Sequence, residues 1–105
     1  MTHRIHLRGH WEVSEPMPGR VRFVRRFGRP RMSDSVRFIR LVISGHMLPG
    51  TVRINSSAPR FVECDPFSFD PGNLQPRNEL TVEGTGDSTS PPPEVVMEID
   101  EGAGD

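Results

Sequence analysis

The chain has 105 residues, with 13 arginines, no lysine, 14 acidic residues and a formal net charge of −1. This length is enough for one domain with one hydrophobic core, and a charge so close to zero argues against a nucleic-acid-binding domain, which is usually strongly basic. No apolar run is long enough to span a membrane, and the N-terminus is polar where a signal peptide would be apolar. We therefore expect a cytoplasmic protein. The single cysteine, Cys64, cannot form an internal disulfide.

The charges are divided unevenly along the sequence. Residues 1–60 contain twelve arginines and three acids, a net charge of +9, whereas residues 61–105 contain one arginine and eleven acids, a net charge of −10. Two interpretations are open. Either the two halves neutralise each other within the fold, or the opposite charges attract a protein partner or a second copy of the chain.

The N-terminal segment 4–13 alternates strictly between apolar and polar residues. This period of two predicts one half-buried strand, and Trp11 shares the apolar parity, so a core role is favoured over a sugar-stacking role. Residues 17–20, Met-Pro-Gly-Arg, predict a type II turn, because proline stands at the second position and glycine at the third. The residues predicted to face the core are Ile5, Leu7, Gly9, Trp11 and Val13.

A second strand is predicted after this turn, because Val21, Phe23 and Phe27 share one parity and arginines occupy most of the other. Arg25 breaks the pattern at an inward position, and a bulge or an edge position there would avoid burying an unpaired charge. Arginines interleaved with phenylalanines are also typical of single-stranded nucleic-acid sites. The inward parity of the phenylalanines favours pairing of these arginines with acidic strands instead.

The rest of the chain contains short extended segments separated by Pro-Gly turns. Residues 35–44 are apolar at both parities, which predicts a central strand covered on both faces. With about seven strands and no segment of helical period, the sequence predicts one all-β domain over residues 1–101, a sandwich or barrel, and a frayed tail at 102–105. The other alternating segments contain Val52 and Ile54, Phe67 and Phe69, Leu80 and Val82, and Val95, Met97 and Ile99.

The order of these segments, over roughly residues 20–100, resembles the N-terminal jelly-roll domain of glycoside hydrolase family 2 enzymes. The resemblance implies a galactose-binding domain-like jelly-roll β-sandwich of two antiparallel sheets. It also implies a non-catalytic carbohydrate-binding or accessory interaction module. The motifs that carry it are Arg25-Arg26-Phe27, the apolar segment 36–45, Val52-Arg53-Ile54-Asn55, Pro66-Phe67-Ser68-Phe69-Asp70, and the Asn-x-Leu-x-Val motif within 74–82.

Two features depart from the family pattern. Ser56 stands where the family's turn usually has glycine, so we expect another turn geometry after Asn55. The α/β barrel that carries the paired catalytic glutamates of the family is missing from these 105 residues. The resemblance therefore does not imply glycoside hydrolysis.

Three residues are candidates for contacts with a sugar: His46, Asn55 and Arg60. They lie in or beside predicted loops, where polar side chains can reach a ligand. The alternative function is a protein–protein interaction or structural domain that uses the uneven charge, and single-stranded nucleic-acid binding has less support.

Metal binding and catalysis are not expected. His3, His6 and His10 are close in sequence, but on one strand His6 and His10 would lie roughly 13 Å apart at ~3.3 Å per residue, too far to share a zinc ion. Cys64 lies between Glu63 and Asp65, whose negative charges disfavour a thiolate nucleophile. The sequence contains no nucleophile elbow and predicts no cofactor.

Overall fold

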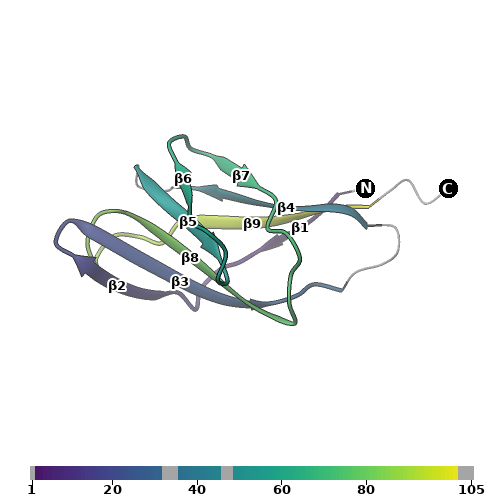
Figure 1. Ribbon diagram of the computed structural model, residues 1–105, viewed down its shortest axis with the longest axis horizontal. Helices are drawn as coiled ribbons and strands as arrows, with labels where there is room; N and C mark the ends of the chain where they lie inside the picture. Colours follow the sequence, from purple (N-terminus) through teal and green to yellow (C-terminus); the bar gives the residue numbers. More distant parts are fainter. Residues whose placement is uncertain (1, 32–35, 46–48, 102–105) are drawn as a thin grey trace.

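The computed structural model describes residues 2–31, 36–45 and 49–101, which form nine strands in two sheets (Figure 1). In both sheets the neighbouring strands are antiparallel, and no helix that could cross a bilayer occurs in the described part of the chain. The four-stranded sheet has the order β1 (Thr2–His6), β9 (Glu94–Glu101), β4 (Val36–Ser44), β7 (Phe67–Phe69). The five-stranded sheet has the order β2 (Glu12–Met17), β3 (Arg20–Gly28), β8 (Arg77–Thr85), β5 (Gly50–Ile54), β6 (Arg60–Val62).

The two sheets form a β-sandwich around a single apolar core. The core arises because one parity of β3, β5, β8 and β9 is apolar, as the alternation predicts. The predicted all-β class and the two antiparallel sheets are confirmed, although β6 was not predicted. The largest fully buried side chains are Leu41, Ile43 and Met97 from the four-stranded sheet and Val21, Val52, Val62, Leu80 and Val82 from the five-stranded sheet.

The N-terminal segment is not the single strand that its alternation predicted. The chain leaves the four-stranded sheet after β1 and joins the five-stranded sheet at β2, and Gly9 and His10 between them have φ values of +67° and +58°. Left-handed residues turn the chain sharply and interrupt strand pairing. Ile5 and Val13 are 39% and 40% exposed because they lie on edge strands at the margin of the sandwich.

Trp11 and the following hairpin agree with the sequence. The indole packs against the core and meets the Phe23 ring edge-on, with ring centroids 6.2 Å apart, so the predicted core role is confirmed. Strands β2 and β3 pair across Pro18 and Gly19, and Gly19 has a φ of +83°, as the third position of a type II turn requires.

Arg25 keeps the inward parity that sequence analysis found difficult to accommodate. The β3–β8 register contains no shift, so the bulge is absent, but β2 pairs with β3 only between Arg20 and Val24. Arg25 is still paired with Leu80 of β8, but it lies beyond the part of β3 that pairs with β2, so β3 is locally an edge at this residue, in line with the edge alternative. Its guanidinium donates to the carbonyl oxygens of Arg26 and Arg8, whereas its Nε is buried without a hydrogen-bond partner in the described structure.

Within the predicted apolar strand, Val36–Ser44 form β4, which lies between β9 and β7, so the predicted central position is confirmed. The prediction that both faces are covered is wrong. Leu41 and Ile43 are fully buried, but Phe38 is 45% exposed because the five-stranded sheet covers only the opposite face. The predicted fraying of residues 102–105 lies outside the described residues.

Candidate functional site

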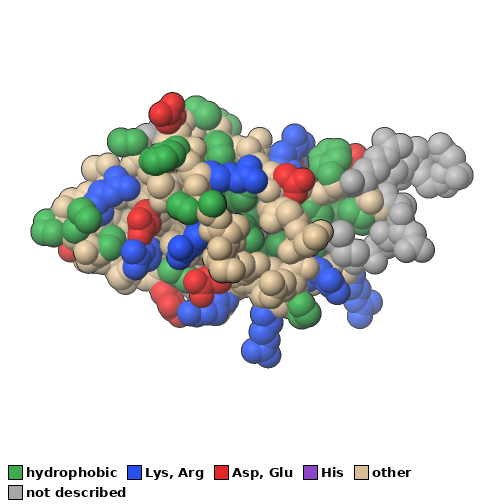
Figure 2. All heavy atoms as spheres, viewed as in Figure 1, with side chains coloured by type: hydrophobic (Ala, Val, Ile, Leu, Met, Phe, Trp, Pro, Cys, Tyr) green, Lys and Arg blue, Asp and Glu red, His purple; other side chains and the backbone are tan. Residues whose placement is uncertain are grey.

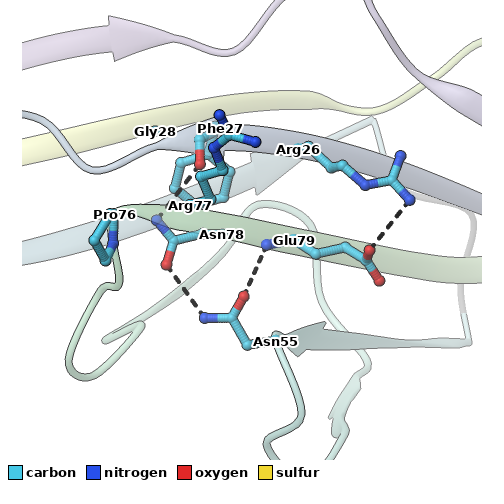
Figure 3. A pocket seen from close by; sticks show the side chains of 8 residues that line it. All are labelled: Arg26, Phe27, Gly28, Asn55, Pro76, Arg77, Asn78 and Glu79. Atoms are coloured by element: carbon cyan, nitrogen blue, oxygen red, sulfur yellow. Dashed lines mark hydrogen bonds and ion pairs between the residues drawn. The ribbon is translucent and has the colours of Figure 1, made fainter.

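An open groove with a volume of about 700 Å³ lies where the start of β8 meets the end of β3 and the turn after β5 (Figure 3). This volume is within the usual range for small-molecule sites, roughly 300–1,000 Å³. We call it the Asn55 groove. It is lined by Arg26, Phe27, Gly28, Asn55, Pro76, Arg77, Asn78 and Glu79.

Asn78 holds the base of the Asn55 groove together. Its side chain is inward on β8, and the residue is only 3% exposed. The Nδ2 group donates to the carbonyl oxygens of Gln75, at 2.8 Å, and Phe27, at 3.5 Å. Its Oδ1 accepts from the backbone N–H of Gln75, at 2.8 Å, and from Nδ2 of Asn55, at 3.2 Å. One amide thus connects β3, β8, the loop before β8 and the turn after β5.

Asn55 forms the side of the groove at the end of β5. Its backbone N–H donates to the carbonyl of Glu79, and its Oδ1 accepts from the N–H of Glu79, both at 2.8 Å. The turn is closed by the Ser57 N–H, which donates to the Ile54 carbonyl at 3.0 Å. Asn55 takes the left-handed conformation with a φ of +53°, whereas Ser56 does not. These bonds leave one amide hydrogen and one lone pair of Asn55 for a ligand.

Charged groups form the rim of the Asn55 groove. Arg26 pairs with Glu79, with 3.4 Å between Nη2 and Oε2 (Figure 3). Arg26 also pairs with Glu12 on β2. Arg77 is exposed and makes no ion pair with a described residue. The rim therefore offers a free guanidinium, a guanidinium–carboxylate pair and an amide, which together can donate to and accept from a hydroxylated ligand.

The three predicted site residues do not form one site. Arg60 lines a different hollow of about 460 Å³, between β5, the 57–59 loop and the segment after β7, with its guanidinium 5.5 Å from the Phe69 ring centroid. His46 lies outside the described residues. Arg77, Asn78 and Glu79 line the groove but were not predicted as site residues. The available signal was Asn78, a polar residue at the inward parity of Leu80 and Val82.

The arginines of β3 lie opposite the glutamates of β8 on the outer face of the five-stranded sheet. Arg22 Nε is 2.5 Å from Glu83 Oε1, next to the Arg26–Glu79 pair. On the other sheet, Arg4 and Arg40 flank Glu98, each at 3.2 Å. Figure 2 accordingly shows basic and acidic side chains interspersed on the visible face. Antiparallel pairing of the basic half with the acidic half therefore neutralises charge locally.

The three histidines predicted to be too far apart for a shared metal ion are His3, His6 and His10, and all three lie among the described residues. His3 and His6 have opposite parity on β1, His3 lies 3.3 Å from a carboxylate oxygen of Glu101, and His10 follows in the crossover to β2. Among residues 2–31, 36–45 and 49–101, no group of three or more His, Cys, Asp or Glu side chains could hold a metal ion. Cys64 is exposed and not in a disulfide.

The chain was also compared with protein-family models, with curated proteins and with solved structures, and none of the three comparisons gave a match.

Proposed function

We propose that the chain is a non-catalytic carbohydrate-binding module whose sugar site is the Asn55 groove. The observation that carries the proposal is the combination of a free guanidinium on Arg77, a carboxylate on Glu79 and spare amide capacity on Asn55 around one open hollow. Sugar hydroxyls both donate and accept, so they are matched by such a mixed set of groups. The Asn78 framework holds these groups in place before a ligand arrives, which reduces the entropy lost on binding.

The strand order supports a jelly-roll fold of the galactose-binding type. A jelly roll has eight strands paired in nested fashion, first with eighth, second with seventh, third with sixth and fourth with fifth. If β2 is treated as an addition to the edge, the remaining strands pair in this way, as β1–β9, β3–β8, β4–β7 and β5–β6. This order agrees with the resemblance to the N-terminal domain of family 2 glycoside hydrolases.

The alternative functions receive less support from the geometry. Attraction of a partner by opposite charges needs separated charge, but the arginines of β3 face the glutamates of β8. A nucleic acid would meet the same carboxylates, and the Phe23 and Phe27 rings are buried and cannot stack on bases.

The proposal is tested by recording amide chemical shifts while galactose, glucose, mannose and glucuronate are added separately at millimolar concentrations. We expect the largest shifts at Asn55, Arg77, Asn78 and Glu79, because these residues line the groove. Arg77→Ala should remove the response without unfolding the exposed rim. Arg4→Ala, on the other sheet, is the matched control and should retain it. If none of these sugars shifts the groove amides, the carbohydrate proposal is wrong.

A further inference from the structure

A second hollow lies in line with the Asn55 groove along the outer face of β8. It has a volume of about 280 Å³ and is lined by Arg22, Thr51, Arg53, Pro59, Thr81 and Glu83. Glu79 of the groove and Glu83 of this hollow have the same parity and lie four residues apart, roughly 13 Å at ~3.3 Å per residue. We call it the β8 hollow. The two depressions together are much longer than a single sugar ring.

An exposed aromatic ring flanks the β8 hollow. Phe61 on edge strand β6 is 81% exposed, the most exposed large hydrophobic residue of the described chain. It is paired directly with Thr51, and directly opposed residues of an antiparallel pair point to the same side of a sheet. Its ring therefore lies beside a hydroxyl group that lines the hollow. An aromatic ring next to polar groups can stack on the apolar face of a sugar while its hydroxyls are hydrogen-bonded.

We propose that the Asn55 groove and the β8 hollow are two subsites for one linear polysaccharide, with Phe61 as the stacking platform at the far end. This inference rests on the proposed carbohydrate function and extends it from a sugar to a chain of sugars. Arg53 and Thr81 lie opposite each other between the groove and the Thr51–Phe61 pair, so polar side chains line the whole path. Neither residue has a hydrogen-bond or ion-pair partner that occupies its side chain in the described structure.

The ligand we assign to this path is a neutral polysaccharide, because both carboxylates on the path are already ion-paired, although Arg53 and Arg77 leave it with two positive charges that are unpaired in the described part of the chain. Glu83 and Glu79 occur at regular spacing along it and are paired with Arg22 and Arg26. A polyanion, whether a uronic-acid polymer or a nucleic acid, could pair with the free guanidinium groups of Arg53 and Arg77, but it would also bring its charges against these two carboxylates. A neutral glycan can instead use paired guanidinium and carboxylate groups as hydrogen-bond donors and acceptors. Two linked subsites also strengthen binding, because the second contact is intramolecular.

The test begins with soluble β-1,3-glucan, β-1,4-glucan, mannan, galactan and xylan, and continues with oligomers of one to six units of the polymer that binds best. We expect the hexamer to bind at least tenfold more tightly than the monomer. Phe61→Ala and Arg53→Ala should weaken the hexamer five- to tenfold and leave the monomer unchanged, whereas Arg77→Ala should weaken both. Phe38→Ala, an exposed phenylalanine on the other sheet, is the matched control. Because Phe61 and Arg53 are exposed, thermal unfolding should show that both variants remain folded.

The outcomes separate the two proposals. If the groove amides respond to a monosaccharide but affinity does not rise with length, or Phe61→Ala has no effect on the hexamer, the polysaccharide inference is wrong and the sugar site stands. Binding of a single-stranded oligonucleotide or polyuronate in preference to every neutral polymer, with loss at high salt, would overturn the assignment of a neutral ligand. If no glycan of any length shifts the groove, both proposals fail.

Discussion

Replacement of Asn78 by alanine tests whether the groove depends on one buried amide. The change removes four hydrogen bonds, two donated to carbonyl oxygens and two accepted from N–H groups. At about 1 kcal/mol each, with a discount for the long 3.5 Å bond and for solvent access to Gln75, the loss of unfolding free energy should be about 3 kcal/mol. For a domain of this size, such a loss lowers the melting temperature by roughly 15 °C.

The measurement is urea unfolding followed by circular dichroism, with the variant and the parent compared under one set of conditions. Asn73→Ala is the matched control, because Asn73 is exposed and lies five residues before Asn78; its effect should be within about 0.5 kcal/mol. If Asn78→Ala lowers the free energy of unfolding by less than about 1 kcal/mol, and the slope of that free energy against urea concentration is unchanged, water molecules replace the hydrogen bonds of the Asn78 amide. The groove would then not be preorganised by this residue.

Three further outcomes follow from the described contacts. Asn55→Gly should lower the free energy of unfolding by about 2 kcal/mol, because two side-chain hydrogen bonds are removed. Asn55→Ala should lower it by about 1 kcal/mol more, because alanine is strained at a φ of +53°. Equal losses for the two variants in urea unfolding would contradict the strain argument. The hydrogen bond from the Thr89 hydroxyl lowers the pKa of Asp87 in the folded state. The contribution of this bond to the free energy of unfolding is therefore present above the pKa that Asp87 has in the unfolded chain, and it is lost as the pH falls through the pKa of the folded state. Carboxyl titration by NMR should show a higher pKa for Asp87 in Thr89→Ala but not in Ser88→Ala. Arg25→Met should raise the free energy of unfolding by about 1 kcal/mol, because it removes a buried nitrogen that has no hydrogen-bond partner in the described structure. The control Arg53→Met should leave the free energy of unfolding unchanged. If Arg25→Met lowers the free energy of unfolding, the hydrogen bonds of Arg25 to backbone carbonyls contribute more than the unpaired nitrogen costs.

The fold class could be predicted from sequence because burial alternates along β9 from Glu94 to Asp100, and along β8 with the exception of Thr81, and strand parity is a local property. The crossover at Gly9 and His10 was not accessible, since alternation continues unchanged when a chain passes from one sheet to the other. The apolar character of β4 was misread for a related reason. Phe38 is apolar but faces outward, and composition does not report which face a second sheet covers.

The site was predicted only in part, because its geometry comes from contacts distant in sequence. Loop position pointed to Asn55, but its role depends on Glu79, 24 residues away. Arg60 was grouped with it by proximity in sequence, whereas the backbone directs Arg60 toward Phe69 and a separate hollow. Arg77 gave no signal of its own, since an exposed arginine after a proline is common in any loop.

The division of charge between the two halves of the sequence also affects how the strands find each other. Pairing of Arg4 with Glu98 closes a loop of 94 residues, and such distant contacts make folding slow. In the unfolded chain, a segment of +9 and a segment of −10 attract one another and bring these distant partners closer before any strand forms. Salt screens this attraction over about 10 Å at 0.1 M, so added salt should slow refolding more than it speeds unfolding. The arginines and glutamates that form weak surface ion pairs in the folded protein thus also bring distant segments together early in folding.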